Sequence, residues 1–154
     1  MTPSRETPGR RQIAAVGAEL DVTGWGGSQW GAVLLVGLGG FVGAGARYIA
    51  SGMVHRAASL EGFPLGTLAV NVLGCLLIGL LGGLMELRQL LGPSMRLFLL
   101  IGVLGGFTTF STLAYETLEL AQAAQLLRAA ANLVAHVVLG LGAAWLGFVV
   151  ARFV

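Results

Sequence analysis

The stretch Gly105-Gly106-Phe107-Thr108-Thr109-Phe110-Ser111-Thr112-Leu113 sets this chain apart from an ordinary membrane-spanning sequence. It lies inside an apolar run, Met95 to about Leu118, that is long enough to cross a bilayer as a helix. Two adjacent glycines weaken the helix, and four of the next six residues carry hydroxyl groups. Lipid offers no water to loosened backbone or hydroxyls, so the segment is expected to face protein or a water-filled path. The pattern predicts a helix broken near Gly105-Gly106.

The composition is that of an integral membrane protein. Of 154 residues, 56% are hydrophobic and 10% are charged, against about 25% charged in soluble domains. The formal charge of +2 is too small for nucleic-acid binding. All nine basic residues are Arg, which excludes lysine chemistry, and the single Cys75 excludes a disulfide within one chain. We interpret Cys75 as a small packing residue.

Four apolar segments predict an all-α protein with four transmembrane helices. They run roughly from Gly31 to Met53, Pro64 to Met85, Met95 to Leu118 and Leu126 to Val150, each near the roughly 20 residues that a span needs. Small residues recur at four-residue spacing, which favours close helix packing and no particular function. The predicted domains are an N-terminal tail, residues 1–30, disordered or at the membrane surface, and a transmembrane domain, residues 31–154.

The arginines near the ends of the spans indicate little preference for one orientation. Arg11, Arg88, Arg96 and Arg152 fall on one side, and Arg47, Arg56 and Arg128 on the other. The bias that sets orientation is therefore weak, and insertion in either direction is possible. Four helices are also few to enclose a pore, which favours a dimer.

Uncharged polar residues inside the spans are the candidates for function. Asn71 shares one helix face with Thr67 and Gly74, and its amide either donates to an anion or joins two helices. In the third span Thr108 and Thr112 would share a face, as would Thr109 and Glu116. The hydroxyls either donate to an anion or bond back to their own helix.

A break in the third span would supply two further kinds of ion contact. Carbonyls freed near Gly105-Gly106 suit a hard cation such as Na+. The helix after the break would point its positive dipole end into the membrane. The ring of Phe110 carries positive charge at its edge, where a desolvated anion could pass, although ordinary packing is the commoner role.

Four other polar residues have weaker assignments. Arg47, near the end of the first span, either anchors the helix at the interface or attracts anions. His136 in the fourth span could titrate or line a path, but a packing role with a hydrogen bond is the more common one. Glu116 and Glu119 would repel anions at a mouth, which favours a structural or gating role. No nucleophile, acid–base set or His/Glu metal motif is present, so we expect no enzyme.

Together these residues resemble the Fluc/CrcB family of fluoride channels. The matching pieces are Gly39-Gly40-Phe41-Val42-Gly43-Ala44-Gly45-Ala46-Arg47-Tyr48, Gly66 to Gly74, and Gly105 to Thr112. Their order and spacing also match, and the resemblance covers about Gly31 to Val150. The Gly-Gly-Phe-Thr-Thr-Phe-Ser-Thr string is highly specific, whereas the glycine pattern alone is weak.

The resemblance implies a passive, F−-selective channel subunit in the cell membrane that lets fluoride leave the cytoplasm and so reduces its toxicity. Acid outside the cell protonates fluoride to HF, which crosses the lipid bilayer and dissociates inside the cell. Family members form antiparallel dimers with a structural Na+ at their centre. By motif position, the carbonyls of Gly105 and Thr108 would bind Na+. The ion path would include Asn71, Phe110, Thr109, Ser111, Thr112 and, near a vestibule, Arg47.

The chain departs from the family pattern at three positions. Leu113 stands where the family usually has a second Phe, Ala114 where Ser is common, and His136 where small polar residues are frequent. These changes favour a second possibility, a subunit that pairs with another family member as a heterodimer. A small dual-topology, proton-coupled exporter is a third, but it needs a buried carboxylate, and the first span has none.

Overall fold

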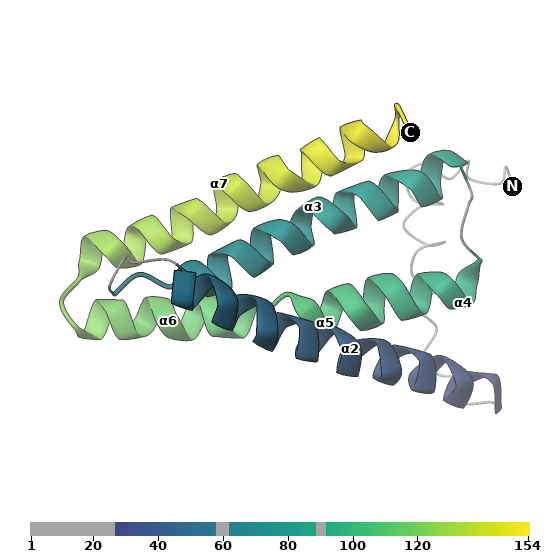
Figure 1. Ribbon diagram of the computed structural model, residues 1–154, viewed down its shortest axis with the longest axis horizontal. Coiled ribbons are helices and arrows are strands. Elements are labelled where there is room, and N and C mark those ends of the chain that lie inside the picture. The colour runs from purple at the N-terminus through teal and green to yellow at the C-terminus, as the bar shows by residue number, and fades with distance from the viewer. Residues whose placement is uncertain (1–26, 58–61, 89–91) are drawn as a thin grey trace, which may run out of the picture. The chain divides into compact units, whose positions relative to one another are not determined.

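The computed structural model describes residues 27–57, 62–88 and 92–154. The chain divides into two units, Met1–Gly31 and Ala32–Val154, and the site lies wholly in the second. Most of the predicted tail, residues 1–26, lies outside the described residues, while residues 27–30 belong to the first helix. In the described part of the chain, helices are the only regular secondary-structure elements (Figure 1).

The described residues form the four predicted membrane spans. The first follows α2 (Gly27–Ala57) and the second α3 (Leu65–Arg88). The third, Pro93–Gln122, contains α4 (Pro93–Arg96), the π-helical segment η1 (Leu97–Leu104), α5 (Gly105–Phe107) and α6 (Phe110–Gln122). The fourth follows α7 (Leu126–Ala151). Each is long and apolar enough to cross a bilayer, so the prediction of four transmembrane helices is confirmed.

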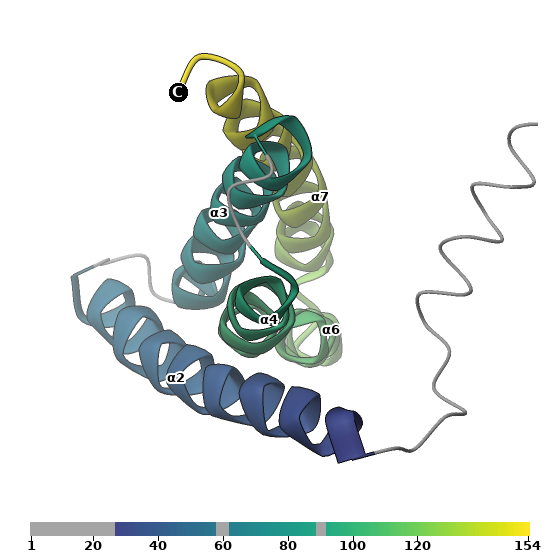
Figure 2. The same ribbon diagram turned by 90° about the vertical axis from the view of Figure 1, so that its right-hand side faces the viewer.

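The helices α3 and α7 lie side by side (Figures 1 and 2), and small residues bring their backbones together. A Cβ on Gly79 would meet the Ala144 carbonyl, and one on Gly147 would lie 2.7 Å from the Leu80 nitrogen. Membrane helices gain their packing energy from such close approach, because lipid supplies no hydrophobic drive. The predicted small-residue spacing therefore serves packing here.

Glycines also pack α2 against the third span. A Cβ on Gly102 would lie 2.9 Å from the Gly39 Cα, and one on Gly106 would lie 3.0 Å from the Gly40 Cα. Both Gly102 and Gly106 remain helical. Gly106 is thus needed for close contact with α2.

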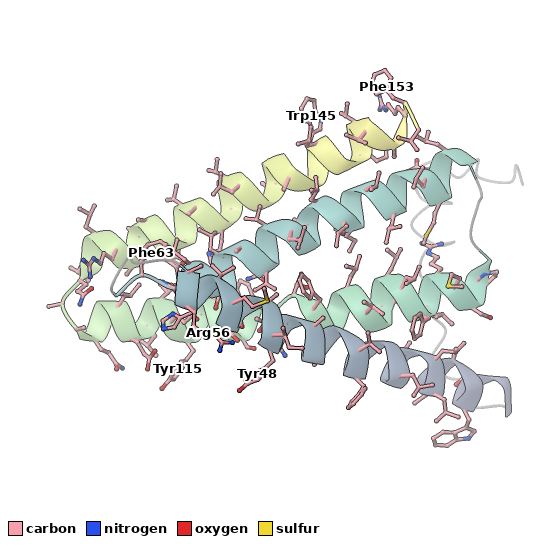
Figure 3. All side chains as sticks on the ribbon, viewed as in Figure 1. Tyr48, Arg56, Phe63, Tyr115, Trp145 and Phe153 are labelled. Carbon is pink, nitrogen blue, oxygen red and sulfur yellow. The ribbon has the colours of Figure 1, made fainter. Side chains whose placement is uncertain are left out.

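Large apolar side chains cover the outside of the helices. Trp145 and Phe153 point away from α7, as Tyr115 points away from α6 (Figure 3), and all three are exposed. Exposed apolar side chains of this kind suit contact with lipid. The protein is therefore a multi-pass membrane protein.

Candidate functional site

The third span is interrupted at two residues that follow α5. Thr108 (φ −89°, ψ 156°) and Thr109 (φ −151°, ψ 117°) are extended, whereas Gly105 and Gly106 are still helical. β-branched threonine favours extended backbone, and its hydroxyl can replace a helical hydrogen bond. The helix is broken near Gly105-Gly106 as predicted, with the extended residues starting two positions after Gly106.

Asn71 on α3 holds the broken backbone in place. Its Oδ1 accepts a hydrogen bond from the Thr109 N–H at 2.8 Å, and its Nδ2 donates to the Thr109 carbonyl at 3.1 Å. The amide therefore satisfies two backbone groups that would otherwise be unpaired inside a membrane. The sequence left two roles open for the Asn71 amide, donating to an anion or joining two helices. The contact with Thr109 joins two helices.

The break releases two carbonyls from their usual partners. In a continuous α-helix the Thr109 N–H would donate to the Gly105 carbonyl, and the Thr112 N–H to the Thr108 carbonyl. Here the first N–H donates to Asn71, and the second donates to the Thr109 Oγ1 at 3.2 Å. The carbonyls of Gly105 and Thr108 are consequently available to a cation.

Three of the four hydroxyls gather at the start of α6. The Thr109 Oγ1 caps this helix and lies 3.1 Å from both the Ser111 Oγ and the Thr112 Oγ1. The fourth, Thr108, bonds back to the Leu104 carbonyl at 3.0 Å. A continuous helix would place Thr108 and Thr112 on one face. The break changes this arrangement, because it brings the Thr109 hydroxyl next to the Thr112 hydroxyl.

A cavity of about 380 Å³ lies beside the break. Its wall includes three of the predicted path residues, Asn71, Thr109 and Phe110, together with both predicted cation ligands. Leu113 and His136 complete the side toward α6 and α7. Of the predicted path residues, Ser111, Thr112 and Arg47 are not part of this wall, and Arg47 lies half-buried on α2.

A second polar network continues along α3, α6 and α7. The Thr67 hydroxyl donates to the Glu116 Oε1 at 2.6 Å, one turn before Asn71. The Thr117 hydroxyl donates to the Leu113 carbonyl at 2.7 Å and accepts from the Asn132 Nδ2 at 2.9 Å. Sequence reasoning missed Asn132, although its four-residue spacing to His136 places both on one face of α7.

The structure confirms the prediction that Thr67, Asn71 and Gly74 share one face of α3. Thr67 meets α6, Asn71 meets the break, and Gly74 leaves room for the Thr108 methyl group. All three residues face the third span. One face of α3 therefore supports the broken third span along its length.

Comparison with known proteins gives a consistent result. The family model described as CrcB-like protein, Camphor Resistance (CrcB), matches residues 34–148. The chain is 47% identical over 116 residues to a "Fluoride-specific ion channel FluC" of Methylobacillus flagellatus, covering 75% of this chain and 91% of that protein. It is 46% identical over 122 residues to the protein of the same name in Nitratidesulfovibrio vulgaris, covering 79% and 98%.

A third relative, which has a numbered name, shows a similar degree of identity. "Fluoride-specific ion channel FluC 1" of Methanosarcina acetivorans is 44% identical over 115 residues, covering 75% of this chain and 86% of that protein. The matched family region contains the break, its Asn71 support and the neighbouring cavity. The chain therefore belongs to the CrcB-like protein family.

Proposed function

We propose that this chain is a subunit of a passive, fluoride-selective channel that lets F− leave the cytoplasm across the cell membrane. The printed names of its relatives support fluoride as the ion. The observation that carries the proposal is the break in the third span, which Asn71 holds open beside a cavity. Irregular backbone at membrane depth is tolerated where it lines such a space.

The surroundings of the break suit a small anion. The first N–H groups of α6 have no helical partners, and the positive end of the helix dipole lies at the same point. Thr109, Ser111 and Thr112 add hydroxyl donors, and Phe110 can offer the positive edge of its ring. Fluoride gives up its water reluctantly, so these groups would replace its hydration shell.

Na+ is the cation that we assign to the freed carbonyls. Gly105 and Thr108 offer backbone oxygens whose usual helical donors are bound elsewhere. Carbonyl oxygens are the ligands that hard cations prefer. Two carbonyls from one chain are too few for a complete shell, so the remaining ligands would come from a second copy. Bound Na+ would hold the two copies together and offset the negative carbonyl dipoles.

A second subunit completes the proposed path. Phe110 lines the cavity, yet its side chain is 79% exposed in the single chain. An anion beside an exposed ring would meet lipid, so a partner is needed to close this side. We assign the partner as a second, antiparallel copy, in keeping with the weak arginine bias, or as another member of the family.

Fluoride efflux from liposomes tests this function. The purified full chain is reconstituted alone in Na+ buffer, and F− and Cl− efflux are compared with protein-free vesicles. Rapid efflux of F− without Cl− is the expected result. Well-folded dimers that pass neither ion would contradict a self-sufficient homodimer, and co-reconstitution with a second family member would then test the heterodimer.

A further inference from the structure

A second cavity adjoins the first, toward the end of the spans at which α3 ends and α4 begins. It has a volume of about 480 Å³ and is lined by residues of α3, α4, η1 and α7. Ile78 and Leu100 line both cavities, so the second continues the space beside the break. In Figure 1, α3 and the third span diverge in this direction. The site at the break therefore extends toward one end of the spans.

The wall of the second cavity changes from apolar to charged along its length. Ile78 and Leu100 lie where it meets the first cavity, whereas Glu86 lies near the end of α3 and Arg96 at the end of α4. From Ile78 to Glu86 the helix rises by about 12 Å. The Glu86 and Arg96 side chains are both exposed. Charged side chains near the end of a span face water, so the outer part of this cavity is open to water.

Gly82 keeps the middle of the second cavity open. It lines this cavity together with Gly79 and Gly83, but these two glycines pack on α7. A Cβ on Gly79 would meet the Ala144 backbone, and one on Gly83 would lie 2.7 Å from the Ala151 Cβ. A Cβ on Gly82 would meet nothing within 4 Å. Helix packing therefore does not require glycine at position 82, and a larger side chain there would enter the cavity.

The rim of the second cavity carries more positive than negative charge. Arg96 and Glu86 belong to its wall, and so does Phe148, whose ring centre lies 5.1 Å from the Arg152 Cζ. Two guanidinium groups thus stand near one carboxylate. Apolar walls of low dielectric focus the field of such charges and raise the local concentration of an anion. Arginine suits this place because it stays charged and offers five N–H donors.

We propose that the second cavity is a water-filled mouth through which F− reaches the break. Arg96 attracts the anion, and Gly82 leaves the mouth wide enough for it to pass. The ion then enters the first cavity between Ile78 and Leu100, where Phe110 and the hydroxyls at the start of α6 replace its water. This inference rests on the proposed function and adds a route of entry to it.

The position of this mouth agrees with the direction of the spans. A path across a membrane needs an opening on each side. Arg47 lies near the end of the first span and Arg96 near the start of the third, so the two residues belong to opposite sides. The second cavity therefore supplies an opening on the side away from Arg47.

The first test is the effect of rim charge on the F− current through the reconstituted full chain. The F− concentration is held constant while sodium gluconate sets the total salt. At about 10 mM salt, where the screening length is about 30 Å, Arg96→Gln should lower the current about threefold and Glu86→Gln should raise it by a similar factor. At about 1 M salt, with a screening length of about 3 Å, both effects should vanish.

Two matched variants control for this charge effect. Arg96→Lys keeps the positive charge and should carry a current close to that of the unaltered chain. Arg128→Gln removes the same charge from the other end of the spans, where Arg128 donates to Gln125 and lines neither of the two cavities. It should change the current much less than Arg96→Gln. An attraction that acts at the mouth predicts this difference, whereas a general effect of surface charge does not.

The second test fills the mouth. Gly82→Leu should lower the F− current severalfold at low and at high salt alike, because salt does not screen a steric block. Gly142→Leu is the control, since Gly142 is also free of atoms within 4 Å of an added Cβ but lies exposed on α7 and lines neither cavity. Its current should match that of the unaltered chain. Thermal unfolding of both variants shows whether they are folded.

The outcomes separate the mouth from the function on which it rests. An unchanged current in folded Gly82→Leu overturns the mouth, and a lipid chain that fills the cavity would give this result. A current that ignores Arg96→Gln and Glu86→Gln at low salt overturns the role of the rim. The charge test stands even where Gly82→Leu fails to fold, because both charged side chains are exposed. Absence of F− current in the unaltered chain removes the proposed function and the inference together.

Discussion

Asn71 holds both backbone groups of Thr109, accepting from the N–H at 2.8 Å and donating to the carbonyl at 3.1 Å. The two residues are 38 positions apart, on different spans. An asparagine amide has one acceptor and one donor group in the geometry of a peptide, so it can replace a neighbouring strand for a single residue. The extended break thus has the hydrogen bonding that it needs inside a membrane.

Asn71→Ala should lower both stability and F− flux. It leaves the Thr109 N–H and carbonyl without partners, at a cost of about 2 kcal/mol or more. Thermal unfolding in detergent and F− efflux from liposomes measure the two effects. Leu73→Ala, on the exposed side of the same helix, is the control and should change neither appreciably. Unaltered flux in a stable Asn71→Ala protein would show that the break forms without the amide.

Thr109→Val should destabilise the start of α6. The Thr109 Oγ1 accepts from the Thr112 N–H and contacts two further hydroxyls, and loss of such a cap costs about 1 kcal/mol. Thr109→Ser keeps the hydroxyl at nearly the same place and is the matched control. Unfolding temperatures and F− efflux of the two variants should separate clearly. Equal behaviour of Val and Ser at this position would mean that the hydroxyl has no role.

Gly147→Ala should separate α3 from α7. The added Cβ would lie 2.7 Å from the Leu80 backbone nitrogen and meet the Leu76 carbonyl, and neither backbone atom can move aside alone. Overpacking of this kind costs about 1–3 kcal/mol. Gly142→Ala, on the same helix with no atom within 4 Å, should unfold at the temperature of the unaltered chain or above it. A Gly147→Ala protein as stable as Gly142→Ala would contradict the close packing.

Removal of Na+ should destabilise the folded protein. A ligand present at about one hundred times its Kd stabilises the folded state by about 2.7 kcal/mol. Replacing Na+ with choline during thermal unfolding should therefore lower the unfolding temperature, and restoring Na+ should recover it. K+ at equal ionic strength controls for screening by salt. Identical unfolding in all three salts would rule out the proposed site at the Gly105 and Thr108 carbonyls.

Local patterns could predict the spans and the approximate break, whereas contacts between helices could not be predicted. Four apolar runs near 20 residues long specify four spans, and paired glycines with hydroxyls mark a weak point in one of them. The extended residues are nevertheless Thr108 and Thr109, because Gly106 packs on α2 as helix and Asn71 binds the next turn. The Thr67–Glu116 hydrogen bond spans 49 positions, and nothing in either segment alone reveals it.

The two roles left open for His136 show the same limit. The sequence favoured a packing histidine with a hydrogen bond, and the Nδ1 contact with Asn132 confirms that part. Only the folded arrangement places His136 among the residues that line the cavity. A pattern of residues along one helix can indicate a shared face, but which neighbour that face meets depends on packing among all the spans.

Leu113→Phe should keep F− flux. Leu113 is 7% exposed and lines the cavity, so a larger ring at this position has about 380 Å³ of open space beside it. The substitution restores the ring edge that the resemblance implies, next to Phe110, and adds a second place where an anion meets positive ring charge. Leu113→Ala, which enlarges the cavity without adding a ring, is the comparison. If the family ring is accommodated, flux through Leu113→Phe should equal or exceed that of the unaltered chain. Complete loss of flux in a folded Leu113→Phe dimer would mean that the third span is aligned wrongly with the family motif, and with it the roles assigned to Phe110 and Thr112.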